Sequence, residues 1–227
     1  KDRFSVDINY FNKLTENQII NLLVEGATGY TNQTVNLGSV RNTGIEMMVG
    51  FVPIRTKNFE WSFSANYSKI KNNVESLGLS NDTEILLNSS YDIDLKAVVG
   101  KPLGALYSPQ PATNDAGQII VNPTTGLPLL SGDKAFRGTI NPDFSLGLSS
   151  QIKYKRLSLG GNADYRKGGV FYSYTARLNY FVGNAWNTQY NDRQPWIIPN
   201  SVTDNGDGTY KENTTPISRA NVFAYYG

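Results

Sequence analysis

The sequence predicts an all-β fold, namely a segment of an antiparallel transmembrane β-barrel with long extracellular loops. Three observations support this prediction. Five stretches alternate between apolar and polar residues, the connections between them are short and long in turn, and 12% of the 227 residues are aromatic. Alternation with a period of two indicates strands that have two different faces, and aromatic residues are enriched in strands.

The five expected strands share one pattern, in which every second residue is apolar and most residues between are polar or Gly. Each runs about 9 to 12 residues, which suits a tilted strand crossing a bilayer better than the roughly 5 or 6 residues of strands in soluble sheets. Their apolar positions are Phe4, Val6, Ile8 and Tyr10; Ile45, Met47, Val49 and Phe51; Phe59, Trp61, Phe63, Ala65 and Tyr67; Phe144, Leu146, Leu148, Ile152 and Tyr154; and Leu157, Leu159, Ala163 and Tyr165.

The connections alternate strictly in length. Only residues 53–58 separate the second and third strands, and the turn between the fourth and fifth is centred on residues 155–156. The other three connections, 13–38, 72–141 and 167–227, are long. If every strand crosses the same layer, all short turns lie on one side and all long loops on the other. Bacterial outer-membrane barrels have this layout, with short periplasmic turns and long extracellular loops.

Turn-forming residues punctuate the long connections. Residues 123–126 and 203–210 are predicted to form tight turns because they are rich in Gly, Asn, Asp, Pro and Thr. Residues 204–208, Asp-Asn-Gly-Asp-Gly, also offer oxygen ligands of the kind that calcium prefers. They lack the EF-hand loop pattern and its closing bidentate Glu, so a Gly-rich turn is the favoured interpretation.

Composition excludes several functions. The sequence has no Cys and no His, which excludes disulfides, Ser-His-Asp catalysis and imidazole metal ligands. The net charge of +2 provides no basic field for nucleic acid. No apolar run approaches the roughly 20 residues of a membrane helix. No cofactor is expected.

Other readings of the pattern remain open at this point. A soluble β-sandwich also has alternating strands, although a connection as long as 72–141 without strong strand character argues against it. A soluble or surface β-domain that binds or hydrolyses carbohydrate is a second possibility, and hydrolysis would need two carboxylates in one cleft. A surface adhesin, which would need no transport machinery, is a third. The carboxylates on polar strand faces are Asp7, Glu46, Glu60 and Asp164.

Ordered motifs along the whole chain point to a family. Residues 38–46, Gly-Ser-Val-Arg-Asn-Thr-Gly-Ile-Glu, are similar to an N-x-G-x-V-x-N-x-G-x-E strand, and an aromatic strand follows at 58–61. Residues 99–107 are similar to a G-x-P-x-G-x-x-Y/F segment, and residues 138–144 match a G-x-x-x-P-x-F strand entry. Together these motifs resemble the SusC/RagA group of TonB-linked outer-membrane proteins.

This resemblance implies a barrel of about 22 strands, of which residues 1–227 are a part. The N-terminal plug and the final barrel strands are expected to lie outside this sequence. The resemblance further implies an outer-membrane location, import of oligosaccharides or peptides, and no enzymatic activity. The implied partners are a SusD-like surface lipoprotein, the TonB complex acting through the plug region, the imported ligand and outer-membrane lipid.

Aromatic and polar residues of the last long connection are candidates for contact with the ligand or the lipoprotein lid. Aromatic rings stack on sugars, and amide or guanidinium groups donate hydrogen bonds to them. The simpler interpretation of each is loop packing or an interface girdle. The candidates are Tyr172, Tyr174, Asn184, Trp186, Asn187, Tyr190, Arg193 and Trp196.

Overall fold

The computed structural model describes residues 3–23, 27, 29–30, 32–78 and 83–218. The chain divides into two compact units, residues 1–107 with 136–170, and residues 108–135 with 171–227. Helices within the described ranges are all too short or too polar to cross a membrane.

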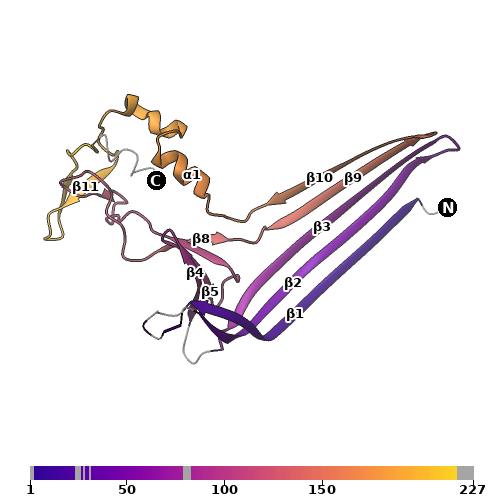
Figure 1. Ribbon diagram of the computed structural model, residues 1–227, viewed down its shortest axis with the longest axis horizontal. Helices are drawn as coiled ribbons and strands as arrows, with labels where there is room; N and C mark the ends of the chain where they lie inside the picture. The colour runs from indigo at the N-terminus through magenta and orange to yellow at the C-terminus, as the bar shows by residue number, and fades with distance from the viewer. Residues whose placement is uncertain (1–2, 24–26, 28, 31, 79–82, 219–227) are drawn as a thin grey trace. The chain divides into compact units, whose positions relative to one another are not determined.

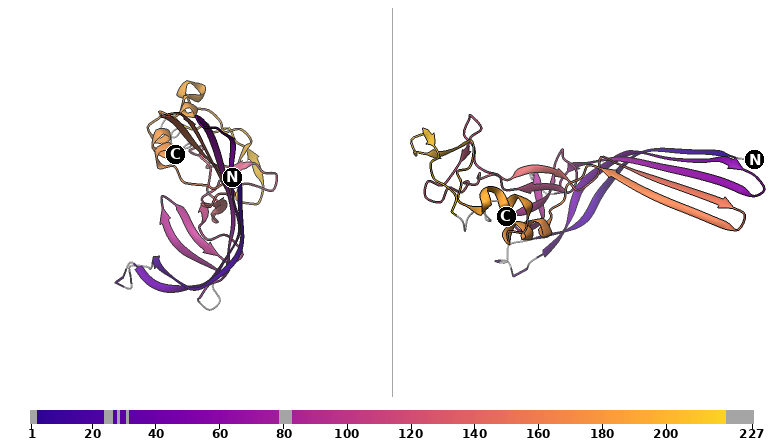
Figure 2. Two further views of the ribbon diagram at one scale, coloured as in Figure 1. Left: turned by 90° about the vertical axis from the view of Figure 1, so that its right-hand side faces the viewer. Right: turned by 90° about the horizontal axis from the view of Figure 1, so that it is seen from above.

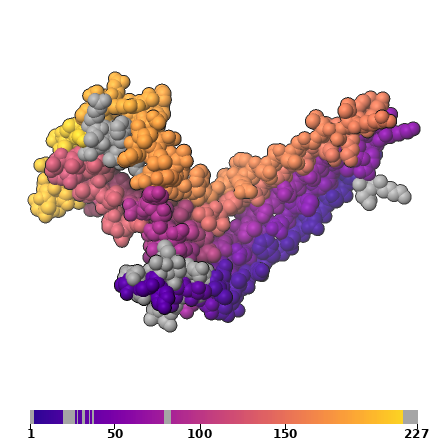
Figure 3. All heavy atoms as spheres, viewed as in Figure 1, coloured from indigo at the N-terminus to yellow at the C-terminus, as the bar shows by residue number. Residues whose placement is uncertain are grey.

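A five-stranded antiparallel sheet in the order β1-β2-β3-β9-β10 dominates the first unit, and its strands lie side by side (Figures 1 and 2). In the space-filling view the same strands follow one another in order of colour, from indigo β1 to orange β10 (Figure 3). All five predicted strands are therefore confirmed. Their bounds are Phe4–Leu23 (β1), Asn32–Arg55 (β2), Phe59–Ser76 (β3), Phe144–Tyr154 (β9) and Leu157–Lys167 (β10).

Both short turns are confirmed. The β2–β3 turn is tighter than residues 53–58 suggested, and the β9–β10 turn lies at residues 155–156 as predicted. Thr56 closes the β2–β3 turn, since its backbone N–H donates to the carbonyl oxygen of Phe59 at 2.7 Å. Lys155 turns the β9–β10 hairpin with a left-handed φ of 51°. Its N–H donates to the carbonyl oxygen of Asn58 at 2.8 Å, which joins the two turns at the same end of the sheet.

The prediction of a long connection over residues 13–38 was wrong. β1 and β2 run 20 and 24 residues, and their pairing continues from Leu14 opposite Arg41 to Leu23 opposite Asn32. The apolar alternation stops near Tyr10 although the hydrogen-bonded ladder goes on. Outside an apolar layer, both faces of a strand contact water, so the sequence pattern is lost while the strand persists.

The connection 72–141 is also more ordered than expected. It contains all four strands of a sheet in the order β4-β5-β6-β8. A small core joins this sheet to the middle of β2 and the end of β3 through the buried side chains of Val40, Val74, Leu77, Ile85 and Ala97. The strand bounds are Glu84–Ser90 (β4), Ile93–Val98 (β5), Ala105–Ser108 (β6) and Ala135–Thr139 (β8).

The second unit has its own core, built from Val121, Ile198 and Ile217, which are at most 1% exposed. A small sheet in the order β12-β11-β7 surrounds it, and the two predicted turns close hairpins within this unit. Two helices that the sequence analysis did not predict also lie here. The bounds are Ile119–Ile120 (β7), Tyr174–Phe181 (α1), Trp186–Arg193 (η2), Ser201–Asp204 (β11) and Tyr210–Glu212 (β12).

Candidate functional site

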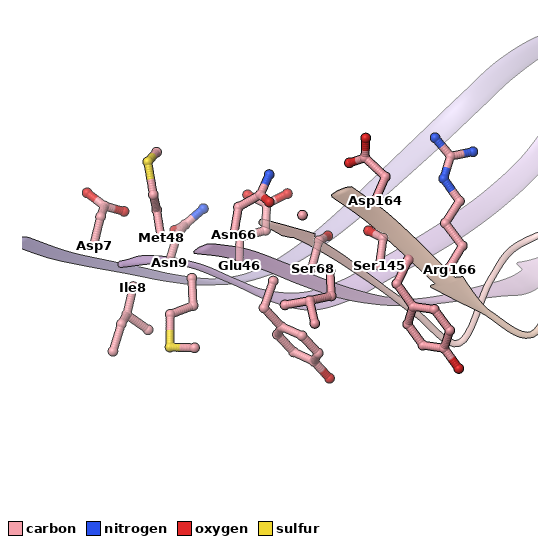
Figure 4. A pocket seen from close by; sticks show the side chains of 15 residues that line it. Asp7, Ile8, Asn9, Glu46, Met48, Asn66, Ser68, Ser145, Asp164 and Arg166 are labelled. Carbon is pink, nitrogen blue, oxygen red and sulfur yellow. The ribbon is translucent and has the colours of Figure 1, made fainter. Parts of the chain in front are cut away.

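The polar face of the five-stranded sheet is organised in rows that cross all five strands. Figure 4 shows the labelled polar side chains of two rows on one side of the sheet, with Ile8 on the other. The rows follow from the pairing registers, because directly opposed residues share a face. They are Asn9, Glu46, Ser68, Ser145 and Arg166, and then Asp7, Met48, Asn66, Gly147 and Asp164.

The opposite face is apolar and exposed. Ile8 and Tyr165, on the two outer strands, are 62% and 55% exposed, and Leu148 on β9 is 38% exposed. The ring of Phe144 contacts those of Tyr67 and Tyr165, at 5.6 and 6.0 Å between centroids. A continuous exposed apolar face on strands of this length is the arrangement of a barrel wall in contact with lipid.

A shallow hollow of about 750 Å³ is lined by these polar rows and contains both signs of charge. Asp7 and Asp164 lie in one row on the first and last strands, four strand spacings or roughly 19 Å apart. Glu60 is paired with Arg55 at 2.8 Å. Glycosidase carboxylates are only ~5 to 9.5 Å apart, so Asp7 and Asp164 do not form such a pair. The face as a whole offers dispersed hydrogen-bonding groups, as a wet lumen does.

Asn72 holds the connection between β5 and β6 over the polar face of the five-stranded sheet. Its Nδ2 donates to Asn42 Oδ1 at 2.6 Å, and its Oδ1 accepts from the backbone N–H of Leu103 at 2.7 Å. Asn141 Nδ2 donates to the carbonyl oxygen of Leu103 at 3.3 Å. The Gly-Lys-Pro-Leu-Gly segment, residues 100–104, is therefore held by side chains from β3 and from the connection after β8.

We expect Asn72→Ala to loosen this segment, because the partly buried N–H of Leu103 loses its acceptor. Loss of one such partner costs about 1–3 kcal/mol. Hydrogen exchange of the Leu103 amide is therefore expected to accelerate roughly 5- to 150-fold in the variant. Asn73→Ala is the matched control, since Asn73 lies on the other face and makes one long bond of 3.4 Å to the Val74 carbonyl. Equal acceleration in both variants would contradict this role.

Two of the candidate loop residues are brought together. The rings of Tyr190 and Trp196 meet edge to face, at 5.0 Å between centroids. Arg193 lies between them in sequence, and its Nη2 donates to the carbonyl oxygen of Gly183 at 2.9 Å. Tyr190 is 56% exposed, whereas Trp196 packs partly against the core of the second unit. The Tyr190 ring is thus presented to solvent and supported from one side.

The other candidates are spread over the same unit. Tyr172 precedes α1, and Tyr174 is its first residue, with exposed fractions of 37% and 42%. Asn184 lies between the helices, and Trp186 begins η2 with Asn187 next to it. The side chains of Asn184 and Asn187 are exposed, and Trp186 is 82% exposed.

The backbone after Tyr190 is unusual. Asn191, Asp192 and Arg193 have φ values of 51°, 51° and 59°, in the left-handed region. Such a conformation costs non-Gly residues about 1–3 kcal/mol each, and clusters of it occur at binding and switching sites. Sequence reasoning missed this feature, although Asn and Asp are the residues that tolerate it best.

The turn at residues 204–208 uses its carboxylates internally. Asp204 Oδ1 accepts from the N–H of Gly206 at 2.7 Å. Asp207 Oδ1 accepts from the Thr209 N–H at 2.9 Å and its hydroxyl at 2.6 Å, and the hydroxyl's hydrogen bond is the largest cause lowering the pKa of Asp207. These bonds build the β11–β12 hairpin, in agreement with the interpretation as a turn.

Comparisons with known proteins agree on the class. No family model matches the chain. The TonB-dependent receptor P26 of Formosa agariphila is 22% identical over 220 residues, which cover 89% of this chain and 22% of that protein. The TonB-dependent receptor SusC of Bacteroides thetaiotaomicron is 27% identical over 185 residues, covering 76% and 17%. The RagAB peptide transporter structure matches with a TM-score of 0.61 at 18% identity, covering 78% and 21%.

The two-faced sheet, its length and these matches define the first unit as part of an outer-membrane-type β-barrel wall. The sheet does not close within the described residues. The chain is similar in sequence to TonB-dependent receptors, SusC among them, and similar in fold to the RagAB transporter. It spans about a fifth of the length of these relatives. The predicted fold class and the resemblance are both confirmed.

Proposed function

We propose that residues 1–227 form part of the wall and outer loops of an outer-membrane transporter that imports oligosaccharides or peptides. The observation that carries this proposal is the sheet with one exposed apolar face and one face of polar rows. The apolar face contacts lipid, and the polar face lines a lumen through which a hydrophilic ligand passes. The relatives are named as receptors and as a peptide transporter, which supports a role in transport and none in catalysis.

We further propose two partners for the whole protein. A SusD-like surface lipoprotein acts with the outer loops to capture ligand, and the TonB complex supplies energy from the inner membrane. In this arrangement the second unit, which carries the aromatic candidates, belongs to the extracellular side. Its exposed rings then contact either ligand or lid.

Trp186 and Tyr190 are the residues we assign to ligand contact. Both are more than half exposed, at 82% and 56%, so neither is needed to fill a core. Tyr190 is also held by the edge-to-face contact with Trp196 and by the left-handed residues that follow it. A ring supported in this way offers a flat apolar surface with little conformational entropy to lose on binding.

The test measures uptake by whole cells that express the full-length protein. The probes are a fluorescent malto-oligosaccharide and a fluorescent decapeptide. Removal of an aromatic contact is worth about 0.5–1.5 kcal/mol, so Trp186→Ala with Tyr190→Ala should weaken uptake of one probe roughly 5- to 150-fold in combination. Phe171→Ala is the control, since Phe171 is 84% exposed in the same unit. Unchanged uptake in the double variant would refute the assignment, and absence of uptake by the unaltered protein would refute transport of these ligand classes.

A further inference from the structure

Three lysines form a cluster on the outward face of the sheet, at the end away from the short turns. Lys69 and Lys71 follow Tyr67 on β3 with the same alternation, so they share its outward face. Lys167 shares the face of Tyr165 in the same way on β10. All three side chains are exposed.

The pairing register brings the cluster together around one ring. Ser68 pairs with Ser145, so Lys69 and Phe144 are the next opposed positions, and Phe144 pairs with Lys167. Lys69 and Lys167 therefore flank Phe144 in one row. They lie two strand spacings apart, roughly 10 Å, and Lys71 is about 7 Å further along β3. These distances are within reach of flexible lysine side chains that converge on one anionic group.

The three lysines and Phe144 also line one hollow of about 550 Å³, and its lining includes Asn72 and Pro102 from the side of the polar face. Asp143 is the one acidic residue in its lining, so the hollow carries two more positive than negative charges. Within the described ranges, none of the ion pairs closer than 4 Å involves Lys69, Lys71 or Lys167. The lysines are thus available to an external anion.

The cluster lies where a membrane headgroup would be. Ten positions of β3 separate Phe59, beside the short turns, from Lys69. At ~3.4 Å per residue and a tilt of ~40°, they span roughly 26 Å along the membrane normal. The apolar band of an outer-membrane barrel is ~25 Å tall, so Lys69 and Lys167 lie at its extracellular rim. The rings of Tyr67 and Tyr165 lie one row below, at the depth of acyl chains.

We propose that Lys69, Lys71 and Lys167 form a binding site for an anionic lipid, in which the ammonium groups hold the headgroup phosphate and the aromatic rings contact the acyl chains. This inference rests on the proposed membrane location and adds a specific ligand class to it. The attraction of lysines to anionic lipid at a membrane surface is a general electrostatic effect. Here the rings of Tyr67, Phe144 and Tyr165 add a place for the lipid tail.

The test compares lipid retention by the purified full protein and a triple variant, Lys69→Gln with Lys71→Gln and Lys167→Gln, by native mass spectrometry. The probes are phosphatidylglycerol, phosphatidylcholine with the same acyl chains, and inorganic phosphate. The unaltered protein is expected to retain more phosphatidylglycerol than phosphatidylcholine. In the triple variant, the ratio of the two retained lipids is expected to fall by roughly tenfold or more. Replacement of the three lysines by Arg should retain it.

A control variant with the same change of charge is Lys13→Gln with Lys153→Gln and Lys211→Gln, since none of these lysines belongs to the outward apolar face. Equal retention of phosphatidylglycerol by the triple variant and the unaltered protein would overturn the site. Displacement of the lipid by millimolar inorganic phosphate would show that phosphate alone is the ligand and would also overturn it. Vesicle flotation separates the two proposals, because an unaltered protein that does not float with lipid contradicts the membrane location itself.

Discussion

Leu148→Arg is expected to destabilise the membrane-inserted protein by about 2–4 kcal/mol, because it places a cation on the lipid face near the bilayer midplane. Leu148 pairs with Ala65 and Ala163, in the row about midway between Phe59 and Lys69. A guanidinium at this depth loses its water and finds no acceptor in hydrocarbon. The measurement is the urea midpoint for unfolding of the full protein in lipid vesicles.

Ser149→Arg is the matched control for this prediction. Ser149 is the next residue of β9, and its side chain belongs to the polar face with Ser64 and Asn162. An arginine there remains in water, and the change in unfolding free energy is expected within ~0.5 kcal/mol. If the two arginines destabilise the protein equally, or if Ser149→Arg is the more harmful, the assignment of the faces is wrong.

Ile217→Ala is expected to open the second unit, since Ile217 is fully buried in a core of three side chains. Such truncations cost about 2–5 kcal/mol. Amide hydrogen exchange at Val121, which donates to the carbonyl oxygen of Val202 at 2.9 Å, should accelerate at least about 30-fold. Because Trp196 packs on this core, uptake that depends on Tyr190 should fall as well.

The control for the second unit is Ile197→Ala. Ile197 adjoins the buried Ile198 in sequence but is 46% exposed. Its truncation removes little buried surface, and exchange at Val121 is expected to change less than about threefold. A large acceleration in Ile197→Ala and none in Ile217→Ala would contradict the core assignment.

The strands that cross the apolar layer could be predicted from sequence because one face must be apolar along their whole length there. Phe59 to Tyr67 shows this most clearly, with five apolar residues at alternate positions. The stretches 13–23 and 32–40 lack that constraint, so their strands carry no such pattern. β4 is harder still, since a bulge between Leu86 and Asn88 interrupts its register.

The helices were missed for a related reason. α1 contains Tyr174, Tyr180 and Phe181, residue types that favour strands, and none of its residues is buried. Its start is fixed by Ser173, whose hydroxyl accepts from the N–H of Ala176 at 3.2 Å. A cap of this kind is a weak signal when no apolar stripe follows it.

The candidate site was predictable only in part. The polar nature of one sheet face follows from alternation, but the rows require the register between β3 and β9, which are separated by the whole connection 77–143. The loop candidates came from composition alone. What brings Tyr190 to Trp196 is the left-handed backbone between them, and the lysine cluster likewise depends on the β3–β9 register.

The parallel pairing of β7 with β11 has a consequence for the order of assembly. Ile119 pairs with Ser201 and Ile120 with Val202, across the intervening β9–β10 hairpin. The second unit is therefore assembled from two stretches of chain, 108–135 and 171–227. The β7–β11 pairs therefore form only when both of these stretches have come together. Contacts of such long sequence separation form slowly, so the hairpin can join its sheet before the second unit is complete.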